Sequence, residues 1–398
     1  MSINRLLELH DLAKRESRKY TRKRFLFAQL LGDQAKHFTG IVGARGTGKT
    51  VLLRQYAFEY DDAFYLSADT LDQDDDPWGL IQKLNQHYGF RTFLLDEIHF
   101  LPDPTALLKR LYDFTDVRIL FSSSVAIAMQ ASSHDLSRRV RLINLHGFSF
   151  REYLTFTQDI SLPHLELVHI IEGQWTQDHL RAGRFFDDYL KGGILPFSID
   201  EPEPFYFLER ILEKVITRDI PSVVRLVVDE LETIRRMLRF VGRSAVDGIN
   251  YSSLSKNLGI TKYKAQQYVD YLEKAFLLHQ VFPAGTNVLR EPKVLMTPPN
   301  RLIYRDFEDA VGGLREDYFV EAMKQADIRF QYLKSTRGAK TPDYLIEEAT
   351  TKLAVEIGGP SKGRQQFKGV KIDRKIVFMH NPVPEKGRLP LFLLGYLT

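Results

Sequence analysis

The chain has 398 residues, a formal net charge of +4, 44% hydrophobic residues and 27% charged residues. This length is too great for one compact core, and the composition is that of a globular protein. The absence of cysteine excludes disulfides, cysteine-ligated zinc and cysteine nucleophiles, and it fits a cytoplasmic location. No apolar run approaches membrane-spanning length, and the first residues lack the apolar core of a signal peptide.

The first 37 residues predict a basic helix. Apolar residues recur at helical spacing from Ile3 to Leu12, and lysines and arginines crowd the stretch from Lys14 to Arg24. We interpret this segment as a solvated helix packed on the domain that follows. A surface that binds DNA or phosphate is the alternative interpretation.

Residues 38–157 alternate predicted strands and helices, which is typical of an α/β nucleotide-binding core. The runs at 38–42 and 92–95 are short and apolar, as in a buried parallel strand. The strands are expected at residues 38–42, 63–67, 92–95, 117–121 and 140–145.

The octapeptide from Gly43 to Thr50 matches the phosphate-binding P-loop pattern G-x-x-x-x-G-K-[ST], between an apolar strand and a predicted helix at 49–59. Its glycines allow backbone N–H groups to face an anion, and the helix directs its positive end toward the same anion. Lys49 is expected to reach the β- and γ-phosphates, and Thr50 to ligate Mg²⁺. The expected nucleotide-binding residues are Gly43, Ala44, Arg45, Gly46, Thr47, Gly48, Lys49, Thr50 and Val51.

A second apolar strand ends in Asp96 and Glu97. The carboxyl ends of parallel strands open at the ligand crevice, which is expected to bring Asp96 beside Thr50 to hold Mg²⁺. Glu97 is then positioned to polarise the water that attacks the γ-phosphate. With His99 the acids also spell the D-E-x-H box of helicases, but we find no motif of a second motor domain.

Two further residues are candidates for phosphate chemistry. The strand that ends in Ser122-Ser123-Ser124 is expected to lie between the P-loop strand and the Asp96–Glu97 strand, and Ser123 is the candidate that faces the γ-phosphate. A serine loop without ligand contact is the alternative. Arg139 is the candidate that stabilises charge on the transferred phosphoryl group, although arginines before an edge strand more often form surface ion pairs.

These motifs resemble those of the prokaryotic AAA-superfamily ATPases that carry a C-terminal winged helix and a restriction-endonuclease-like domain. The resemblance implies that Gly193 and Pro196 line the adenine side of the nucleotide. The family usually shows Ala-Gly-Arg where this chain has Ser137-Arg138-Arg139, so the family arginine maps to Arg139. The resemblance rests on residues 43–50, 94–97, 122–124, 136–140, 148–154, 191–196 and 217–220.

Residues 252–278 predict a helix, a turn and a second helix. Gly259 is expected to supply the left-handed turn, and Thr261 to cap the second helix. The second helix leaves a polar face that suits phosphate and base-edge contacts in a DNA groove, whereas a plain packing module is the alternative. The residues of that face are Lys262, Lys264, Gln266 and Gln267.

The last hundred residues show the outline of a nuclease site of the P-D…(D/E)-x-K type. Its acidic residues are Glu321 on a helix and Asp343 and Glu356 on neighbouring strands. Gly358 occupies the lysine position, and Lys362 substitutes only if the loop folds back. We therefore expect a degenerate site that binds nucleic acid or a partner.

Together the patterns predict an α/β protein with an AAA-type P-loop sheet core. It is expected to be a cytoplasmic Mg²⁺-dependent ATPase that uses ATP and Mg²⁺ and whose nucleotide state controls a C-terminal DNA-binding region. The alternatives are a signalling or scaffold ATPase with a protein partner, or an ATP-gated nuclease. No membrane partner is expected, and self-association stays open. The predicted domains are a basic helix at 1–37, the core at 38–157, a helical lid at 158–240, a winged helix at 241–285 and a nuclease-like domain at 286–398.

Overall fold

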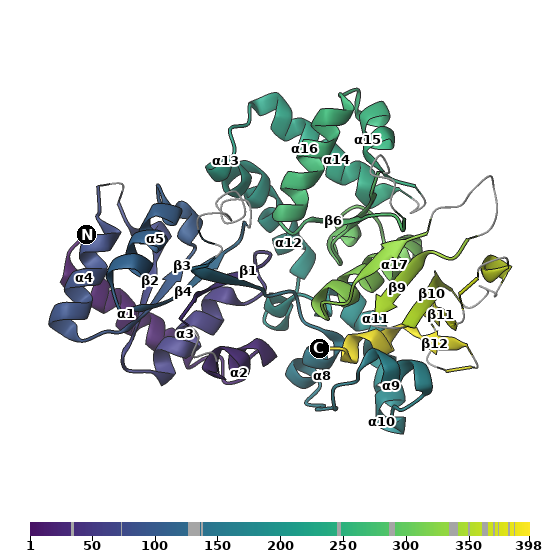
Figure 1. Ribbon diagram of the computed structural model, residues 1–398, viewed down its shortest axis with the longest axis horizontal. Helices are drawn as coiled ribbons and strands as arrows, with labels where there is room; N and C mark the ends of the chain where they lie inside the picture. Colours follow the sequence, from purple (N-terminus) through teal and green to yellow (C-terminus); the bar gives the residue numbers. More distant parts are fainter. Residues whose placement is uncertain are drawn as a thin grey trace. The chain divides into compact units, whose positions relative to one another are not determined.

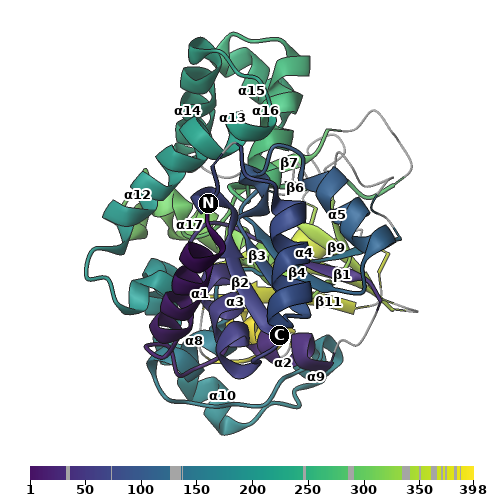
Figure 2. The ribbon, with the colours of Figure 1, turned by 90° about the vertical axis from the view of Figure 1, so that its left-hand side faces the viewer.

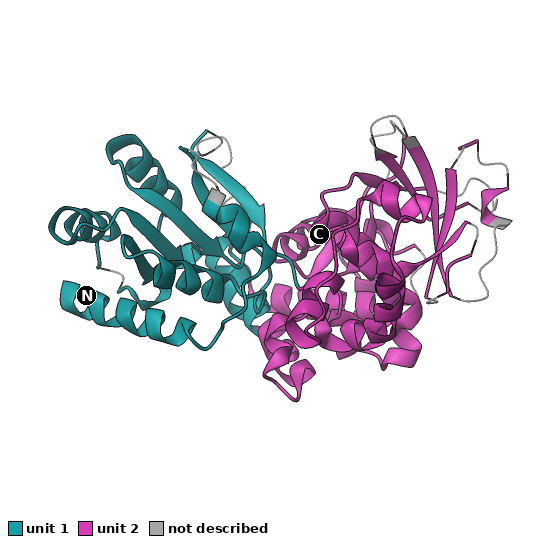
Figure 3. Cartoon of the chain, turned by 90° about the horizontal axis from the view of Figure 1, so that it is seen from below, with its two compact units in different colours: residues 1–147, 214–226 teal, residues 148–213, 227–398 magenta. Residues whose placement is uncertain are grey.

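In a computed structural model the chain divides into two compact units (Figure 3). Unit 1 comprises Met1–Gly147 and Lys214–Leu226, and unit 2 comprises Phe148–Glu213 and Val227–Thr398. No helix among the described residues has the length and apolarity needed to cross a membrane. The structure describes residues 1–32, 36–72, 74–125, 136, 138–244, 248–285, 291–333, 341–348, 351–359, 365–368, 371–372, 374–380, 383–385 and 387–398.

Unit 1 is built on a five-stranded parallel sheet with the strand order β2-β3-β4-β1-β5 (Figure 1). Strand β4 lies between β1 and β3, as the sequence predicts, so the serine tip adjoins both the P-loop strand and the acid-bearing strand. The strands are β1 (Phe38–Val42), β2 (Ala63–Ser67), β3 (Thr92–Asp96), β4 (Arg118–Ser123) and β5 (Val140–Asn144).

Helices cover both faces of this sheet, which explains why its inner strands β1, β3 and β4 are buried along almost their whole length. Helices α2 and α3 pack against one face, and α4 and α5 against the other (Figure 2). The helical segments of unit 1 are α1 (Ile3–Ser17), α2 (Phe25–Gly32), α3 (Lys49–Glu59), η1 (Ala68–Thr70), α4 (Pro77–Tyr88), η2 (Ile98–Phe100), α5 (Pro104–Phe114), η6 (Val215–Asp219) and α13 (Ile220–Val223).

Unit 2 contains a mixed five-stranded sheet, ordered β12-β11-β10-β9-β8, and an antiparallel pair, β6-β7. Strands β9 and β10 are neighbours, as the sequence predicts, and they pair in antiparallel direction. The strands are β6 (Leu278–Val281), β7 (Lys293–Met296), β8 (Phe330–Tyr332), β9 (Tyr344–Glu348), β10 (Thr351–Gly358), β11 (Arg374–Met379) and β12 (Arg388–Pro390).

Some of the helices of unit 2 share one core with its five-stranded sheet, which contributes Tyr344 and Val355 to it. Phe150, Phe186 and Tyr189 belong to the same buried cluster as Tyr318 and Tyr396. The segments are α8 (Phe150–Thr157), α9 (Leu167–Glu172), α10 (Gln177–Ala182), η3 (Gly183–Phe185), α11 (Phe186–Asp188), η4 (Tyr189–Gly193), η5 (Pro196–Ile199), α12 (Pro204–Lys214), α14 (Val228–Arg243), α15 (Tyr251–Leu258), α16 (Lys262–Lys274), η7 (Asn300–Ile303), α17 (Phe307–Gln325), η8 (Gln365–Phe367) and η9 (Leu391–Tyr396).

His10 of α1 binds a backbone N–H group of β2, the edge strand of the unit 1 sheet. The buried His10 ring stacks on Phe64 with 4.7 Å between ring centroids, and its Nδ1 accepts a hydrogen bond of 3.1 Å from the Tyr65 N–H. An unpaired N–H on a sheet edge would otherwise invite another strand. Burial lowers the pKa of His10 to about 4, because a charged imidazolium loses its solvation there.

We expect His10 to make folding pH-dependent. Because its folded pKa lies below its ordinary value of 6.5, the unfolded chain takes up the proton first as the pH falls, and stability is lost between about pH 6.5 and pH 4. The substitution His10→Gln retains an acceptor for the Tyr65 N–H but does not titrate. Between pH 7 and pH 5 the free energy of unfolding should therefore fall by about 2 kcal/mol less in the variant than in the wild type.

Denaturant unfolding at the two pH values measures this difference. The same substitution at the exposed His87 of α4 is the matched control. Equal losses in the wild type and in His10→Gln would contradict the assignment of His10 as a buried neutral histidine.

Candidate active site

The P-loop of unit 1 has the backbone that phosphate binding requires. Gly46 and Gly48 have positive φ angles of 84° and 92°, and a Cβ on Gly43 would lie 2.1 Å from the Leu145 carbonyl oxygen. Side chains at these positions would strain or block the loop. Helix α3 begins at Lys49 directly after Gly48, and a glycine has no side chain that could cap the first N–H groups. The loop and the start of α3 therefore form a cradle that fits phosphate.

Lys49 is buried within this cradle. Its Nζ donates hydrogen bonds to the carbonyl oxygens of Gly43 at 2.7 Å and Ala44 at 2.8 Å. Burial lowers the pKa of Lys49 to about 8, while the nearby carboxylates of Glu97 and Asp96 oppose the shift. Hydrogen bonds to the carbonyl groups of the P-loop thus hold the ammonium group in place, and the two nearby carboxylates stabilise its charge.

A buried arginine that the sequence did not single out supports the loop. The Nη1 of Arg24 donates to the Thr47 carbonyl oxygen at 2.6 Å, and its Nη2 donates to those of His146 and Gly147 at 3.0 and 3.1 Å. The guanidinium thereby joins the P-loop to the segment that follows β5. In the sequence Arg24 is one member of a basic run, and nothing there separates it from its exposed neighbours.

Asp96 lies at the end of β3 with 2% of its surface exposed. One carboxylate oxygen accepts a hydrogen bond of 2.7 Å from the Tyr65 hydroxyl, and the other accepts one from the Ser122 hydroxyl. The Ser122 Oγ in turn accepts the Glu97 N–H at 2.9 Å. These neutral donors fix the Asp96 carboxylate but leave it free lone pairs. Such a carboxylate could bind Mg²⁺ through a bridging water molecule.

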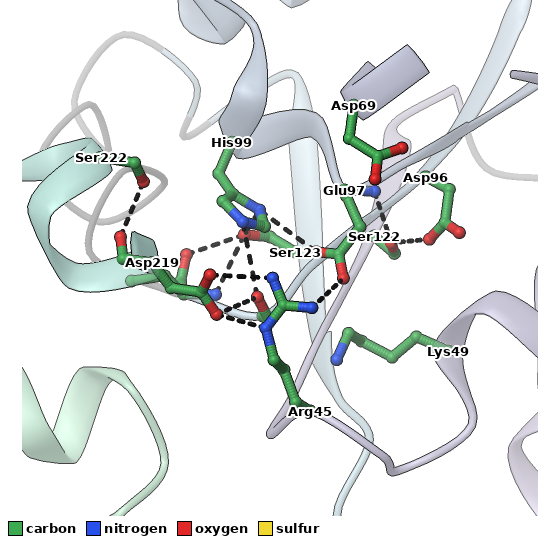
Figure 4. Close-up of polar contacts among 12 residues, drawn as sticks. Arg45, Lys49, Asp69, Asp96, Glu97, His99, Ser122, Ser123, Asp219 and Ser222 are labelled. Atoms are coloured by element: carbon green, nitrogen blue, oxygen red, sulfur yellow. Dashed lines mark hydrogen bonds and ion pairs between the residues drawn. The ribbon is translucent and has the colours of Figure 1, made fainter. Parts of the chain in front are cut away.

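Glu97 turns the chain sharply out of β3 with φ 53° and ψ 45°, which is the left-handed region. Its Oε1 lies 3.4 Å from the Arg45 Nη1, and its Oε2 is buried without a hydrogen-bond partner among the described residues (Figure 4). Burial raises the pKa of Glu97, while Lys49 and Arg45 oppose the rise. A buried acceptor of this kind fits hydrogen bonding to a water molecule.

The three serines at the tip of β4 have different partners. Ser122 contacts both acids, as described above. The Ser123 Oγ donates to the Val125 carbonyl oxygen at 2.8 Å and lies 3.2 Å from the Nδ1 of His99. The role of Ser123 at the γ-phosphate stays a prediction, and Ser122 is the serine that orients Asp96 and Glu97. The sequence located the tip but not the partner of each hydroxyl.

Arg45 of the P-loop binds an aspartate that the sequence did not assign to the site. Its Nη2 donates to the Asp219 Oδ1 at 2.8 Å, and its Nε donates to the other oxygen (Figure 4). Asp219 is fully buried and ends the π-helix η6. It lies in the stretch at 217–220 that the family resemblance singles out, and this stretch is the signal that could have identified it.

The other predicted nucleotide contacts have local roles in the structure. The Arg139 guanidinium binds Asp113 of α5 in bidentate fashion at 2.9 and 3.0 Å. Gly193 packs against the Tyr153 ring so closely that a Cβ would lie 2.5 Å from it. Gly193 and Pro196 belong to unit 2, whereas the P-loop belongs to unit 1. Roles for Arg139, Gly193 and Pro196 in catalysis or adenine binding stay predictions.

A pocket of about 420 Å³ opens beside Thr50, Asp96 and Glu97. Polar side chains from the end of the sheet and from α3 face apolar side chains from α1. Its polar lining includes Thr50, Arg54, Tyr65, Asp69, Asp96 and Glu97.

In unit 2 the acids of the predicted nuclease site have the following partners, and their role stays a prediction. Asp343 is close enough to Glu316 and Glu356 that burial and these two carboxylates raise its pKa to about 7. Glu321 instead contacts the Nε2 of His279 at 2.8 Å. The described residues contain no group of three or more His, Cys, Asp or Glu side chains that could hold a metal ion. Lys362 lies outside the described residues.

The helix–turn–helix of unit 2 forms as predicted, with Gly259 left-handed after α15 and Thr261 capping α16. Lys262 pairs with Glu291 at 2.5 Å, and Lys264 pairs with Glu230 at 3.1 Å. Gln266 is exposed, and Gln267 donates to the Tyr263 hydroxyl at 3.2 Å. Intramolecular carboxylates thus partly offset the positive charge of this face.

Comparison with known proteins agrees with the geometry of unit 1. Residues 35–154 match the model of an AAA domain, and residues 185–298 match that of a domain of unknown function. An uncharacterized protein of Methanocaldococcus jannaschii is 26% identical in an alignment of 378 residues that covers 85% of this chain and 79% of the relative.

Two solved structures are similar at low identity. The Walker-type ATPase of Pyrococcus abyssi has a TM-score of 0.42 and 13% identity, with 70% of this chain and 94% of that chain covered. The Orc1 protein of Aeropyrum pernix in complex with DNA has a TM-score of 0.30 and 13% identity, with 78% and 93% covered. The match at 35–154 contains the P-loop, Asp96, Glu97 and the serine tip, so this chain carries an AAA-type P-loop ATPase domain.

Proposed function

We propose that this protein is a cytoplasmic Mg²⁺-dependent ATPase whose nucleotide state controls its C-terminal region. One observation carries the proposal. The P-loop cradle, Lys49, the buried Asp96 and the partly buried Glu97 converge at the same end of one parallel sheet. This combination supplies a phosphate site, a metal ligand and a base for water, which are the parts that phosphoryl transfer to water requires.

Each residue has a distinct part in the proposed reaction. The N–H groups of the loop and of α3 bind the phosphates of ATP, and Lys49 exchanges its carbonyl partners for phosphate oxygens. Thr50 and Asp96 would hold Mg²⁺, which neutralises phosphate charge when bound. Glu97 orients the attacking water and accepts its proton, and the buried Oε2 supports this role.

Lys49→Ala should abolish useful ATP binding, because it removes a charge-assisted contact to the phosphates. We expect the dissociation constant to rise by roughly 10- to 150-fold or more. Isothermal titration calorimetry with MgATP measures it. Lys14→Ala, which removes a surface lysine paired with Asp61, is the matched control. Unchanged affinity in Lys49→Ala would refute the P-loop assignment.

Glu97→Gln should leave ATP affinity near that of the wild type but lower turnover by roughly 100- to 10,000-fold, because an amide cannot accept the proton from water. A phosphate-release assay on the purified variant, together with the titration above, separates binding from chemistry. Glu59→Gln, at the far end of α3, is the control. Turnover close to the wild-type rate would exclude Glu97 as the base.

The ligand of the C-terminal region is the less defined part of the proposal. The helix–turn–helix supports DNA binding through Lys262, Lys264, Gln266 and Gln267, although both lysines already pair with glutamates. If DNA is the ligand, duplex DNA should raise ATP turnover, and the effect should weaken steeply between about 50 and 200 mM salt. Lys262→Ala combined with Lys264→Ala should reduce the stimulation.

A protein partner is the alternative ligand, and the same assay distinguishes it. If DNA at low salt neither changes the turnover nor binds to the protein, a signalling or scaffold ATPase would be favoured. The pairing of Glu321 with His279 and the glycine at 358 count against an ATP-gated nuclease.

A further inference from the structure

The side chain of Arg45 is shared between two carboxylates. Its Nη1 lies 3.4 Å from Glu97, whereas its Nη2 and Nε both bind Asp219. Figure 4 shows the guanidinium between these two acids, with Lys49 on the side of Glu97. The bidentate contact with Asp219 is the stronger of the two, because two parallel N–H···O bonds fix the plane of the guanidinium.

Asp219 also reaches Glu97 by a second route. The Ser124 hydroxyl donates to the Asp219 Oδ2 at 3.3 Å and lies 3.5 Å from the Nε2 of His99. The other ring nitrogen of His99 lies 3.4 Å from the Glu97 Oε2. Both oxygens of the Glu97 carboxylate are therefore approached by side chains that contact Asp219 directly or through one serine. Burial of this group makes each contact sensitive to the others.

The segment that carries Asp219 is set apart in the chain. Residues Lys214–Leu226 belong to unit 1 by their contacts, although the chain on either side of them belongs to unit 2. Within unit 1 the Arg218 guanidinium lies 4.5 Å from the centre of the Phe100 ring, just beyond the turn that starts at Glu97. The Ser222 hydroxyl donates to the Asp219 carbonyl oxygen at 2.7 Å and fixes the start of α13.

We propose that Asp219 is a positioning residue for Glu97, because it holds Arg45 and so keeps that guanidinium from forming a full ion pair with the base. Without Asp219, Glu97 is the remaining partner in Figure 4 for the charge of Arg45, and an ion-paired carboxylate is a poorer acceptor for water. The inference rests on the proposed ATPase function. It implies that hydrolysis, but not ATP binding, requires residues 214–226 to be seated on the ATPase core.

The test compares the turnover number with the affinity for ATP in the full-length protein. In Asp219→Asn, kcat should fall roughly 10- to 100-fold, whereas the dissociation constant of MgATP should stay within about twofold of the wild type. Arg45→Gln combined with Asp219→Asn should regain most of the lost turnover, because the competing charge is gone. A merely structural role of Asp219 would not give this rescue.

A second variant avoids leaving Arg45 with an uncharged partner. Arg45→Lys keeps the charge but cannot bind Asp219 in bidentate fashion, so it should also lower kcat without loss of ATP affinity. Asp61→Asn, which removes an exposed acid of a surface pair, is the matched control and should leave both values unchanged.

The outcomes separate the inference from the proposed function. A wild-type protein that binds and hydrolyses no ATP would refute the function itself. If the wild type is active, unchanged kcat in Asp219→Asn or in Arg45→Lys would overturn the inference alone. A double variant as slow as Asp219→Asn would overturn it as well. Intact MgATP affinity shows that each variant is folded.

Discussion

The pairing of buried charges at the carboxyl end of the unit 1 sheet is the constraint on which the candidate site depends. Lys49, Asp96 and Asp219 have 5% or less of their surface exposed. An isolated charge in such surroundings costs several kcal/mol, so each group must be held by partners. The contacts with Arg45, Ser122 and the loop carbonyl groups meet this requirement. The rigid sheet and the two layers of helices around it keep these partners in place.

Local patterns in the sequence predicted much of unit 1. The strand bounds at Phe38–Val42 and Ala63–Ser67 and the helix Lys49–Glu59 agree with the structure, because buried parallel strands and P-loop helices have distinctive residue patterns. The contacts of Arg24 with Gly147 and of Arg45 with Asp219 could not be predicted. They join residues far apart in the chain, and neither member of a pair carries a local pattern that identifies the other.

The acidic cluster of unit 2 shows a different limit. The assignment of Glu321 of α17 to the nuclease-like site stays a prediction, and Glu316 of the same helix, which the sequence did not single out, lies near Asp343. Two residues five positions apart lie on different faces of a helix. Helix α17 is buried around most of its circumference, so apolar residues mark no single face and the pattern could not identify Glu316.

The path of the chain has a consequence for dissecting the protein. The chain leaves unit 1 after Gly147, returns at Lys214 and leaves again after Leu226. No single cut can therefore divide it into two complete halves. A fragment that ends at Gly147 contains every residue of the P-loop but lacks the carboxylate that neutralises Arg45. An experiment on such a fragment would therefore report first on whether the fragment folds without Asp219, and only then on its nucleotide site.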